Sequence, residues 1–105
     1  MYDGNINEIR FNWDPLKGET NLSKHGITFE EASTVFYDPY GLVIEDPEHS
    51  WNEERFILLG ISWQSRLLIV CHCYRKETGE IRIISARKAT KHESKAYGAR
   101  RSRHA

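Results

Sequence analysis

The feature that most constrains the fold of this chain is a series of three apolar runs joined by very short connections. They are Arg55 to Ser62, Arg66 to Tyr74 and Glu80 to Ala86, and each is rich in Ile, Leu, Val or Phe. Connections this short join antiparallel strands, because parallel neighbours need a crossover of about a dozen residues or more. The sequence therefore predicts a mostly antiparallel sheet at the centre of the fold.

Shorter elements flank this sheet. Residues 9–13 alternate apolar and polar side chains, as a half-buried strand does, and residues 42–44 form another short apolar run. Three helices are expected: one from Asp14-Pro15 to Gly26, one over residues 28–36 with a capping box at Thr28, and one with a capping box at Thr90. The predicted order is β-α-α-β-β-β-β-α, an α+β domain with its helices packed on one face of the sheet.

A chain of 105 residues has the length of one domain. We expect a loose polar leader over residues 1–8, the folded domain over residues 9–99 and a frayed basic tail over residues 100–105. The sequence holds no secretory signal and no apolar run of the ~20 residues that span a membrane, so the expected location is the cytoplasm.

The two cysteines, Cys71 and Cys73, lie two residues apart in a predicted strand. That spacing is poor for a mutual disulfide, and two thiols alone are too few for a zinc site. We expect both to be buried apolar residues, and we expect neither a metal nor a cofactor.

The net charge of zero hides an uneven distribution. Residues 1–54 hold three Lys and Arg against twelve Asp and Glu, whereas residues 55–105 hold twelve against three. Either the two halves neutralise each other across the fold, or the basic half forms a surface for a polyanion or an acidic partner.

The hairpin of residues 66–86 gives the most specific prediction about a site. A symmetric register around residues 75–79 pairs Tyr74 with Glu80 and His72 with Arg82. One face is then wholly apolar and should pack against the helices; it carries Leu67, Ile69, Cys71, Cys73, Ile81 and Ile83. The other face stays open, places His72 beside Arg82 and includes Tyr74.

A histidine beside an arginine on an exposed sheet suits metal-independent RNA cleavage, in which the 2′-hydroxyl attacks the adjacent phosphate. Histidine transfers protons near neutral pH, and arginine binds phosphate with a two-pronged fork and stabilises added charge. The alternative is that His72 and Arg82 are surface residues without a task.

Further basic residues are weaker candidates. Lys24 and His25 lie at the end of a predicted helix, where simple capping is the alternative. Arg55 opens a strand. A basic run at and within the last helix is either a surface that follows phosphates or a solvated helix face; it consists of Arg87, Lys88, Lys91 and Lys95.

Three stretches of the chain carry a resemblance to a known family. The first stretch consists of residues 11–15, 21–26, 29–32 and 35–39. The second consists of residues 53–56 and Gly60. The third consists of His72, residues 82–89, Glu93 and Tyr97. In this order and spacing, over nearly the whole of residues 9–97, they resemble the BrnT toxins of type II toxin–antitoxin systems.

The resemblance implies a RelE-like fold and a ribonuclease that inhibits translation and growth. It implies a partner antitoxin with a ribbon-helix-helix part, through which alone the complex binds operator DNA. By position it implies the site residues His72, Arg82, Arg87, Arg55, Lys24 and His25, with His72 as base or acid and Arg82 and Arg87 on the scissile phosphate. The residues expected to bind RNA are Lys88, Lys91, Lys95 and Tyr74.

The competing interpretation is a chain without nuclease activity that only binds the antitoxin within a transcription-regulating complex. The enzyme requires His72 and Arg82 together on an exposed face, whereas the binding protein does not. Direct DNA binding by this chain is a poorer interpretation, because no helix-turn-helix pattern precedes the basic last helix.

Overall fold

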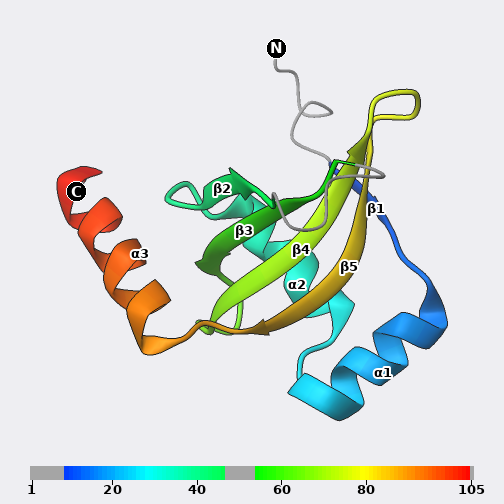
Figure 1. The fold of residues 1–105 in the computed structure, drawn as a ribbon, viewed down its shortest axis with the longest axis horizontal. Helices are drawn as coiled ribbons and strands as arrows, with labels where there is room; N and C mark the ends of the chain where they lie inside the picture. The colour runs from blue at the N-terminus through cyan, green and yellow to red at the C-terminus, as the bar shows by residue number, and fades with distance from the viewer. Residues whose placement is uncertain (1–8, 47–53, 105) are drawn as a thin grey trace.

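A computed structural model describes residues 9–46 and 54–104 as an α+β fold around one five-stranded sheet (Figure 1). The sheet order is β1-β5-β4-β3-β2, with β1 parallel to β5 and the other neighbours antiparallel. In chain order the elements are β1 (Arg10–Asn12), α1 (Pro15–His25), α2 (Phe29–Thr34), the 3-10 turn η2 (Val35–Tyr37), β2 (Leu42–Glu45), β3 (Phe56–Ile61), β4 (Leu67–Arg75), β5 (Glu80–Lys88) and α3 (Lys91–His104).

The helix ends follow the predicted local signals. The Asp14 side chain accepts a hydrogen bond from the Leu16 N–H at the start of α1, and Gly26 ends that helix in the left-handed conformation with φ of 72°. The Thr28 side chain caps α2 by accepting from the Glu31 N–H. These caps satisfy backbone groups that the helix itself leaves unpaired, which explains why α1 begins and ends, and why α2 begins, where the sequence predicts. The helix expected over residues 28–36 ends earlier, at Thr34, and continues as the 3-10 turn η2.

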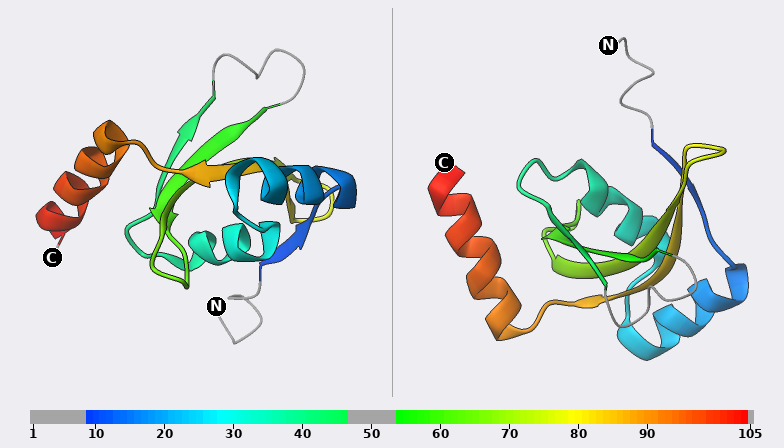
Figure 2. Two further views of the ribbon diagram at one scale, coloured as in Figure 1. Left: turned by 90° about the horizontal axis from the view of Figure 1, so that it is seen from below. Right: turned by 45° about the horizontal axis from the view of Figure 1, so that its top comes forward.

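The main core lies between α1–α2 and one face of the sheet, and Figure 2 shows both helices on the same side. Its buried members come from α2, η2, the segment between α1 and α2, and strands β3 to β5: Ile27, Phe29, Ala32, Val35, Leu58, Leu68, Val70, Ile83 and Ala86. Apolar burial of this kind supplies most of the free energy that holds helices on a sheet.

The register of the β4–β5 hairpin differs from the predicted one. The turn holds four residues instead of five, so Arg75 pairs with Glu80, Cys73 with Arg82 and His72 with Ile83. A β-bulge then shifts the register again, because Cys71 pairs with Ser85 and Ile84 is the extra residue. A shift of one residue turns every side chain to the opposite face.

The predicted assignment of β4 to the two sheet faces is therefore wrong, whereas Ile83 of β5 packs in the core beneath the helices, as predicted. Leu68, Val70 and His72 face α1 and α2, whereas Leu67 and Ile69 lie on the other face. The reason lies in β4 itself, which is the central strand and is apolar on both faces. Its sequence lacks the apolar–polar alternation that would distinguish a buried face from an open one.

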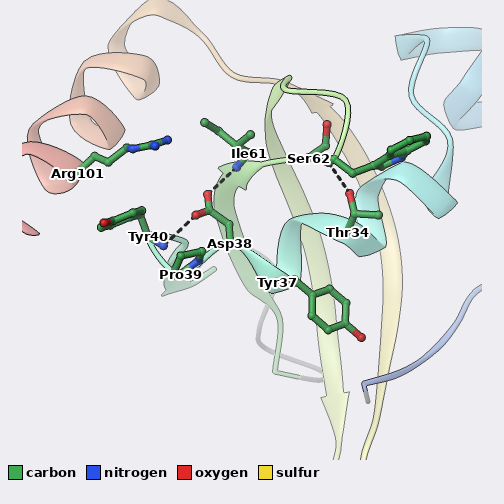
Figure 3. A pocket seen from close by; sticks show the side chains of 9 residues that line it. Thr34, Tyr37, Asp38, Pro39, Tyr40, Ile61, Ser62 and Arg101 are labelled. Carbon is green, nitrogen blue, oxygen red and sulfur yellow. Dashed lines mark hydrogen bonds between the residues drawn. The ribbon is translucent and has the colours of Figure 1, made fainter. Parts of the chain in front are cut away.

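Helix α3 packs on this second face, which corrects the expectation that all helices cover one face (Figures 1 and 2). Its Tyr97 is buried against Leu59 and Ile69 and donates a 2.6 Å hydrogen bond to the Asp38 carboxylate. The same carboxylate accepts from the backbone N–H groups of Tyr40 and Ile61 (Figure 3). The helix continues to His104 and so includes most of the expected basic tail.

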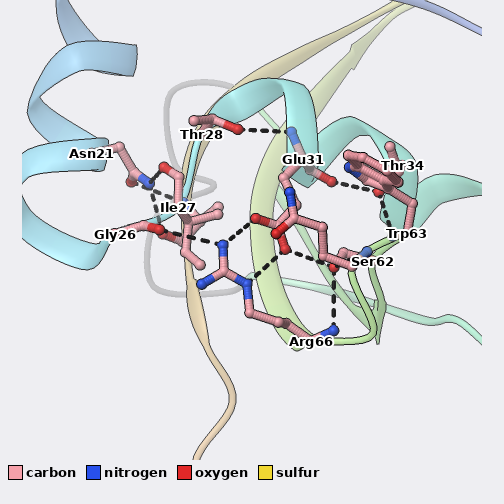
Figure 4. Close-up of polar contacts among 11 residues, drawn as sticks. Asn21, Gly26, Ile27, Thr28, Glu31, Thr34, Ser62, Trp63 and Arg66 are labelled. Atoms are coloured by element: carbon pink, nitrogen blue, oxygen red, sulfur yellow. Dashed lines mark hydrogen bonds and ion pairs between the residues drawn. The ribbon is translucent and has the colours of Figure 1, made fainter.

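A buried ion pair ties α2 to the β3–β4 turn (Figure 4). The Glu31 side chain is only 2% exposed, and both of its oxygens accept hydrogen bonds from Arg66 while Ser62 donates a third. Arg66 lowers the pKa of Glu31 by hydrogen bonding, against the opposing effect of burial. The carboxylate is therefore fully partnered and has a structural role.

Both cysteines are free thiols, and Cys73 is buried, whereas Cys71 is half-buried. None of the helices within residues 9–46 and 54–104 is long and apolar enough to cross a membrane. The expected leader over residues 1–8 lies outside the described residues.

Candidate functional site

His72 is not on an exposed face, contrary to prediction. It is 5% exposed, and its ring lies 4.7 Å from the Phe36 ring and 6.0 Å from the Phe56 ring, measured between centroids. Its Nδ1 is 3.1 Å from the Val70 carbonyl oxygen. Burial lowers the pKa of His72 below its usual value of 6.5, so the ring is neutral at physiological pH. His72 therefore lies in the protein interior, and it lacks the open position that the predicted catalytic role requires.

Arg82 lies on the opposite face from His72, because its partner in the register is Cys73. Residues paired across strands share a face, so Ser85 lies beside Cys71 and Arg87 beside Ile69 on that same face. Two of the predicted arginines, Arg82 and Arg87, thus project from β5 on the same side of the sheet, with Ser85 between them. Arg55 directly precedes β3, and its charge acts on Cys71.

Arg87 already has an acidic partner in this structure. Its two terminal nitrogens donate to the two carboxylate oxygens of Glu93 at 2.9 and 3.0 Å. Glu93 also accepts from the Thr90 N–H, which completes the predicted capping box of α3. Arg87 lowers the pKa of Glu93 to about 2. A phosphate must therefore compete with Glu93 for this guanidinium.

Lys24 and His25 line a cavity of about 280 Å³ between α1 and β5. The remaining lining residues are Leu16, Lys17, Thr20, Asn21, Ile84 and Ser85. The cavity thus joins the end of α1 to the β-bulge of β5, and neither Arg82 nor Arg87 is among its lining residues. Bulges are common beside active sites, since they redirect side chains.

Asn21 fixes α1 against β5 and so gives this cavity its shape. Its Nδ2 donates to the carbonyls of Ile27 and Ala86, at 3.0 and 2.8 Å, while its Oδ1 accepts from the Ala86 N–H at 3.0 Å (Figure 4). The Asn21 amide thus forms with the Ala86 backbone the two hydrogen bonds that a neighbouring strand would otherwise form. Its three hydrogen bonds hold Lys24 and His25 one helical turn further along α1, at the mouth of the cavity.

The cavity combines the His25 imidazole with the ammonium groups of Lys17 and Lys24 and the hydroxyls of Thr20 and Ser85. Imidazole is the side-chain group that most often acts as a general acid or base in enzymes, and ammonium groups neutralise phosphate charge. Sequence reasoning missed Lys17 and Ser85. The seven-residue separation of Lys17 from Lys24 places both on one helix face and was a usable signal, whereas nothing local points to Ser85.

The four residues expected to bind RNA do not form one surface. Tyr74 and Lys88 are exposed but lie near opposite ends of the β4–β5 hairpin, and Lys91 and Lys95 lie on α3. No group of three metal-binding side chains comes together in the part of the chain that the structure describes.

Comparison with known proteins identifies relatives of this fold. The sequence matches the family described as "Ribonuclease toxin, BrnT, of type II toxin-antitoxin system" over residues 13–93. The structure is similar to the crystal structure of the Brucella abortus ribonuclease toxin BrnT, with a TM-score of 0.61 and 21% sequence identity, over 80% of this chain and 100% of that chain. At this identity the likeness shows a shared fold. None of the curated proteins matches the sequence.

Proposed function

The chain belongs to the BrnT family of ribonuclease toxins from type II toxin–antitoxin systems, and we propose that it cleaves RNA at the cavity between α1 and β5. The observation that carries this proposal is the convergence of His25, Lys24 and Lys17 on a cavity that Ser85 of β5 also lines. These groups supply what RNA cleavage needs, namely proton transfer and positive charge.

The proposed reaction requires no metal ion. The 2′-oxygen of the substrate bonds to the adjacent phosphorus while the bond from phosphorus to the 5′-oxygen breaks, which leaves a 2′,3′-cyclic phosphate and a 5′-hydroxyl end. Either His25 takes the 2′ proton and a solvent water protonates the leaving 5′-oxygen, or a solvent water takes the 2′ proton and His25 protonates the leaving oxygen. Lys24 and Lys17 stabilise the charge that builds on the phosphate, and Arg82 binds the neighbouring phosphate.

The family implies a cognate antitoxin as the partner of this chain. We propose that this antitoxin carries a ribbon-helix-helix part, and that operator DNA is bound only through it. In the same proposal, the fold is of the RelE-like type, and free toxin arrests growth by cleaving RNA in the cytoplasm and so inhibiting translation.

The test is cleavage of single-stranded RNA by the purified chain, compared with His25→Ala and Lys24→Ala. Loss of a positioned acid–base group should slow cleavage about 10²- to 10⁴-fold. Matched controls are His104→Ala and Lys76→Ala, which remove an exposed histidine and an exposed lysine elsewhere and should cleave like the parent. Circular dichroism checks that every variant folds.

Two results would contradict the proposal. If the parent cleaves RNA and the His25 and Lys24 variants cleave equally well, the activity stands but the cavity is not its site. If the folded parent leaves RNA intact yet binds its antitoxin, the chain is a binding partner that acts only in the transcription-regulating complex.

A further inference from the structure

A second cavity, of about 380 Å³, is lined by residues of other elements (Figure 3). It is formed by η2, the turn between β3 and β4, and α3, and it shares no lining residue with the cavity between α1 and β5. Three of its nine lining residues are aromatic: Tyr37, Tyr40 and Trp63. Tyr40 packs against the cluster of Leu59, Ile69 and Tyr97, and the Tyr37 hydroxyl accepts a hydrogen bond from the Ile9 N–H at 3.2 Å. Trp63 belongs to neither buried cluster, and the proposed cleavage reaction uses none of the three.

Two of these aromatic side chains are exposed to an unusual degree. Trp63 is 71% exposed and Tyr37 is 54% exposed, although tryptophan and tyrosine rings are usually buried for most of their surface. Trp63 is held through its backbone, since its N–H donates to Thr34 Oγ1 at 2.9 Å. The indole ring therefore contributes little to the fold and is available to a ligand.

Positive charge lies beside these rings. The Arg101 guanidinium stacks 5.1 Å from the centre of the Tyr40 ring, and Arg100 donates to the Tyr40 carbonyl oxygen at 2.9 Å. Arg103 follows on the same helix and is exposed. The lining of the cavity thus combines aromatic side chains with the Arg101 guanidinium, and aromatic faces and positive charge are the two features by which proteins bind single-stranded nucleic acid.

The polar atoms at the floor of the cavity are already used within the fold. Asp38 accepts hydrogen bonds from Tyr40, Ile61 and Tyr97; Ser62 donates to Glu31; and Thr34 donates to the Glu31 carbonyl. A ligand that inserts here meets ring faces rather than unpaired donors or acceptors. Stacking of this kind tolerates any base, because every base has a π-face.

We propose that this cavity is a binding subsite for an unpaired nucleobase of the RNA, stacked against Trp63 and Tyr37 with its phosphate beside Arg101. The inference rests on the proposed ribonuclease function for the identity of its ligand. It adds that RNA is held at a second set of residues, apart from those at the bond that breaks, with little discrimination among the four bases.

The observations favour RNA over a peptide of the antitoxin as the occupant. The described residues offer a different groove to an apolar peptide, between the sheet and the start of α3, lined by Leu42, Ile44, Ile57, Leu59 and Ile69. The aromatic cavity instead presents planar faces beside fixed positive charge, which suits a flat ring that carries a phosphate.

The test measures binding apart from cleavage. The probe is a fluorescein-labelled single strand of 2′-O-methyl RNA about ten nucleotides long, which lacks the nucleophile needed for cleavage, and the readout is fluorescence anisotropy at fixed salt. Trp63→Ala and Tyr37→Ala should each weaken binding about 5- to 100-fold, the range that follows from the measured strength of base stacking. Trp63→Phe keeps an aromatic face and should bind within about threefold of the parent.

The contribution of the Arg101 charge to binding is measured with the same probe. Arg101→Gln should weaken binding and reduce the slope of log Kd against log salt by about one. Arg75→Gln removes an exposed arginine from the far end of β4, and Val43→Ala removes an exposed apolar side chain from β2; both should bind the probe like the parent.

Two outcomes would overturn the inference: the parent fails to bind the probe, or the cavity variants bind it like the parent. If those variants bind the probe normally but lose affinity for the antitoxin, the cavity is a binding site for the protein partner. Cleavage of unmodified RNA is measured in parallel. A parent that binds the probe through Trp63 but leaves unmodified RNA intact contradicts the proposed function and not this inference.

Discussion

Replacement of the buried His72 by phenylalanine should make the stability of this protein less sensitive to mild acid. The imidazole is enclosed by Phe36 and Phe56 and its pKa lies below the usual 6.5 because of burial. In the unfolded chain the same imidazole titrates near 6.5. Between these two pKa values the unfolded state binds a proton that the native state does not, so the free energy of unfolding falls as the pH falls.

The size of the effect follows from one proton. Each pH unit within this window removes up to about 1.4 kcal/mol from the free energy of unfolding, so acidification from pH 7.5 to 5.5 should cost up to about 1.4 kcal/mol. The carboxylates with lowered pKa values, Glu31, Asp38 and Glu93, titrate below their usual 3.8 to 4.5 and so leave this window unaffected. At neutral pH His72→Phe loses one hydrogen bond to the Val70 carbonyl, worth about 0.5–1.5 kcal/mol.

The assay is urea unfolding of the parent and the His72→Phe variant at pH values between 7.5 and 5.0. The variant should lose the acid-dependent slope that the parent shows, and a His104→Gln control, at an exposed histidine, should keep it. Equal slopes in the parent and in His72→Phe would refute the assignment of His72 as the neutral buried histidine. The His72→Phe variant should also cleave RNA like the parent. A stable variant without activity would support a catalytic role for His72 and would contradict the proposal that RNA is cleaved in the cavity between α1 and β5.

Three further predictions concern packing and α3. Glu93→Gln should free Arg87 and tighten binding of the 2′-O-methyl probe several-fold; it should also remove a contribution to thermal stability that is present above pH 4.5 and lost as the pH falls through about 2. Gly60→Ala places a methyl group 2.8 Å from a Val35 methyl and should lower the free energy of unfolding by about 1–3 kcal/mol, a cost that shrinks in the double variant with Val35→Ala. Tyr97→Phe removes a hydrogen bond to the Asp38 carboxylate worth about 1.5–3 kcal/mol, so amide exchange in α3 should accelerate while that in α1 stays unchanged.

The candidate site was predictable where it depends on neighbours in sequence. Lys24 and His25 stand out because they end a helix whose cap residues are local, and the pairing of Thr90 with Glu93 is likewise readable from four consecutive residues. The contribution of Ser85 was not predictable, since that residue meets Lys24 only when Asn21 docks α1 on a strand some sixty residues later.

The sequence by itself determined the order of helices and strands, the antiparallel hairpins and the positions of the helix caps. Each of these follows from short-range chemistry: turn residues, capping side chains and the spacing of apolar residues. The family resemblance also lay in the sequence, since motifs along one chain need no spatial arrangement to be recognised.

Only the tertiary structure decided which face of the sheet packs against α1 and α2, and therefore that the His72 side chain is buried. A four-residue turn and a bulge at Ile84 set the register, and one residue of shift exchanges the two faces. Because β4 is apolar on both sides, its own residues favour neither choice. The choice depends on how α1, α2 and α3 together bury the sheet, which is a property of the whole fold and not of any segment of the chain.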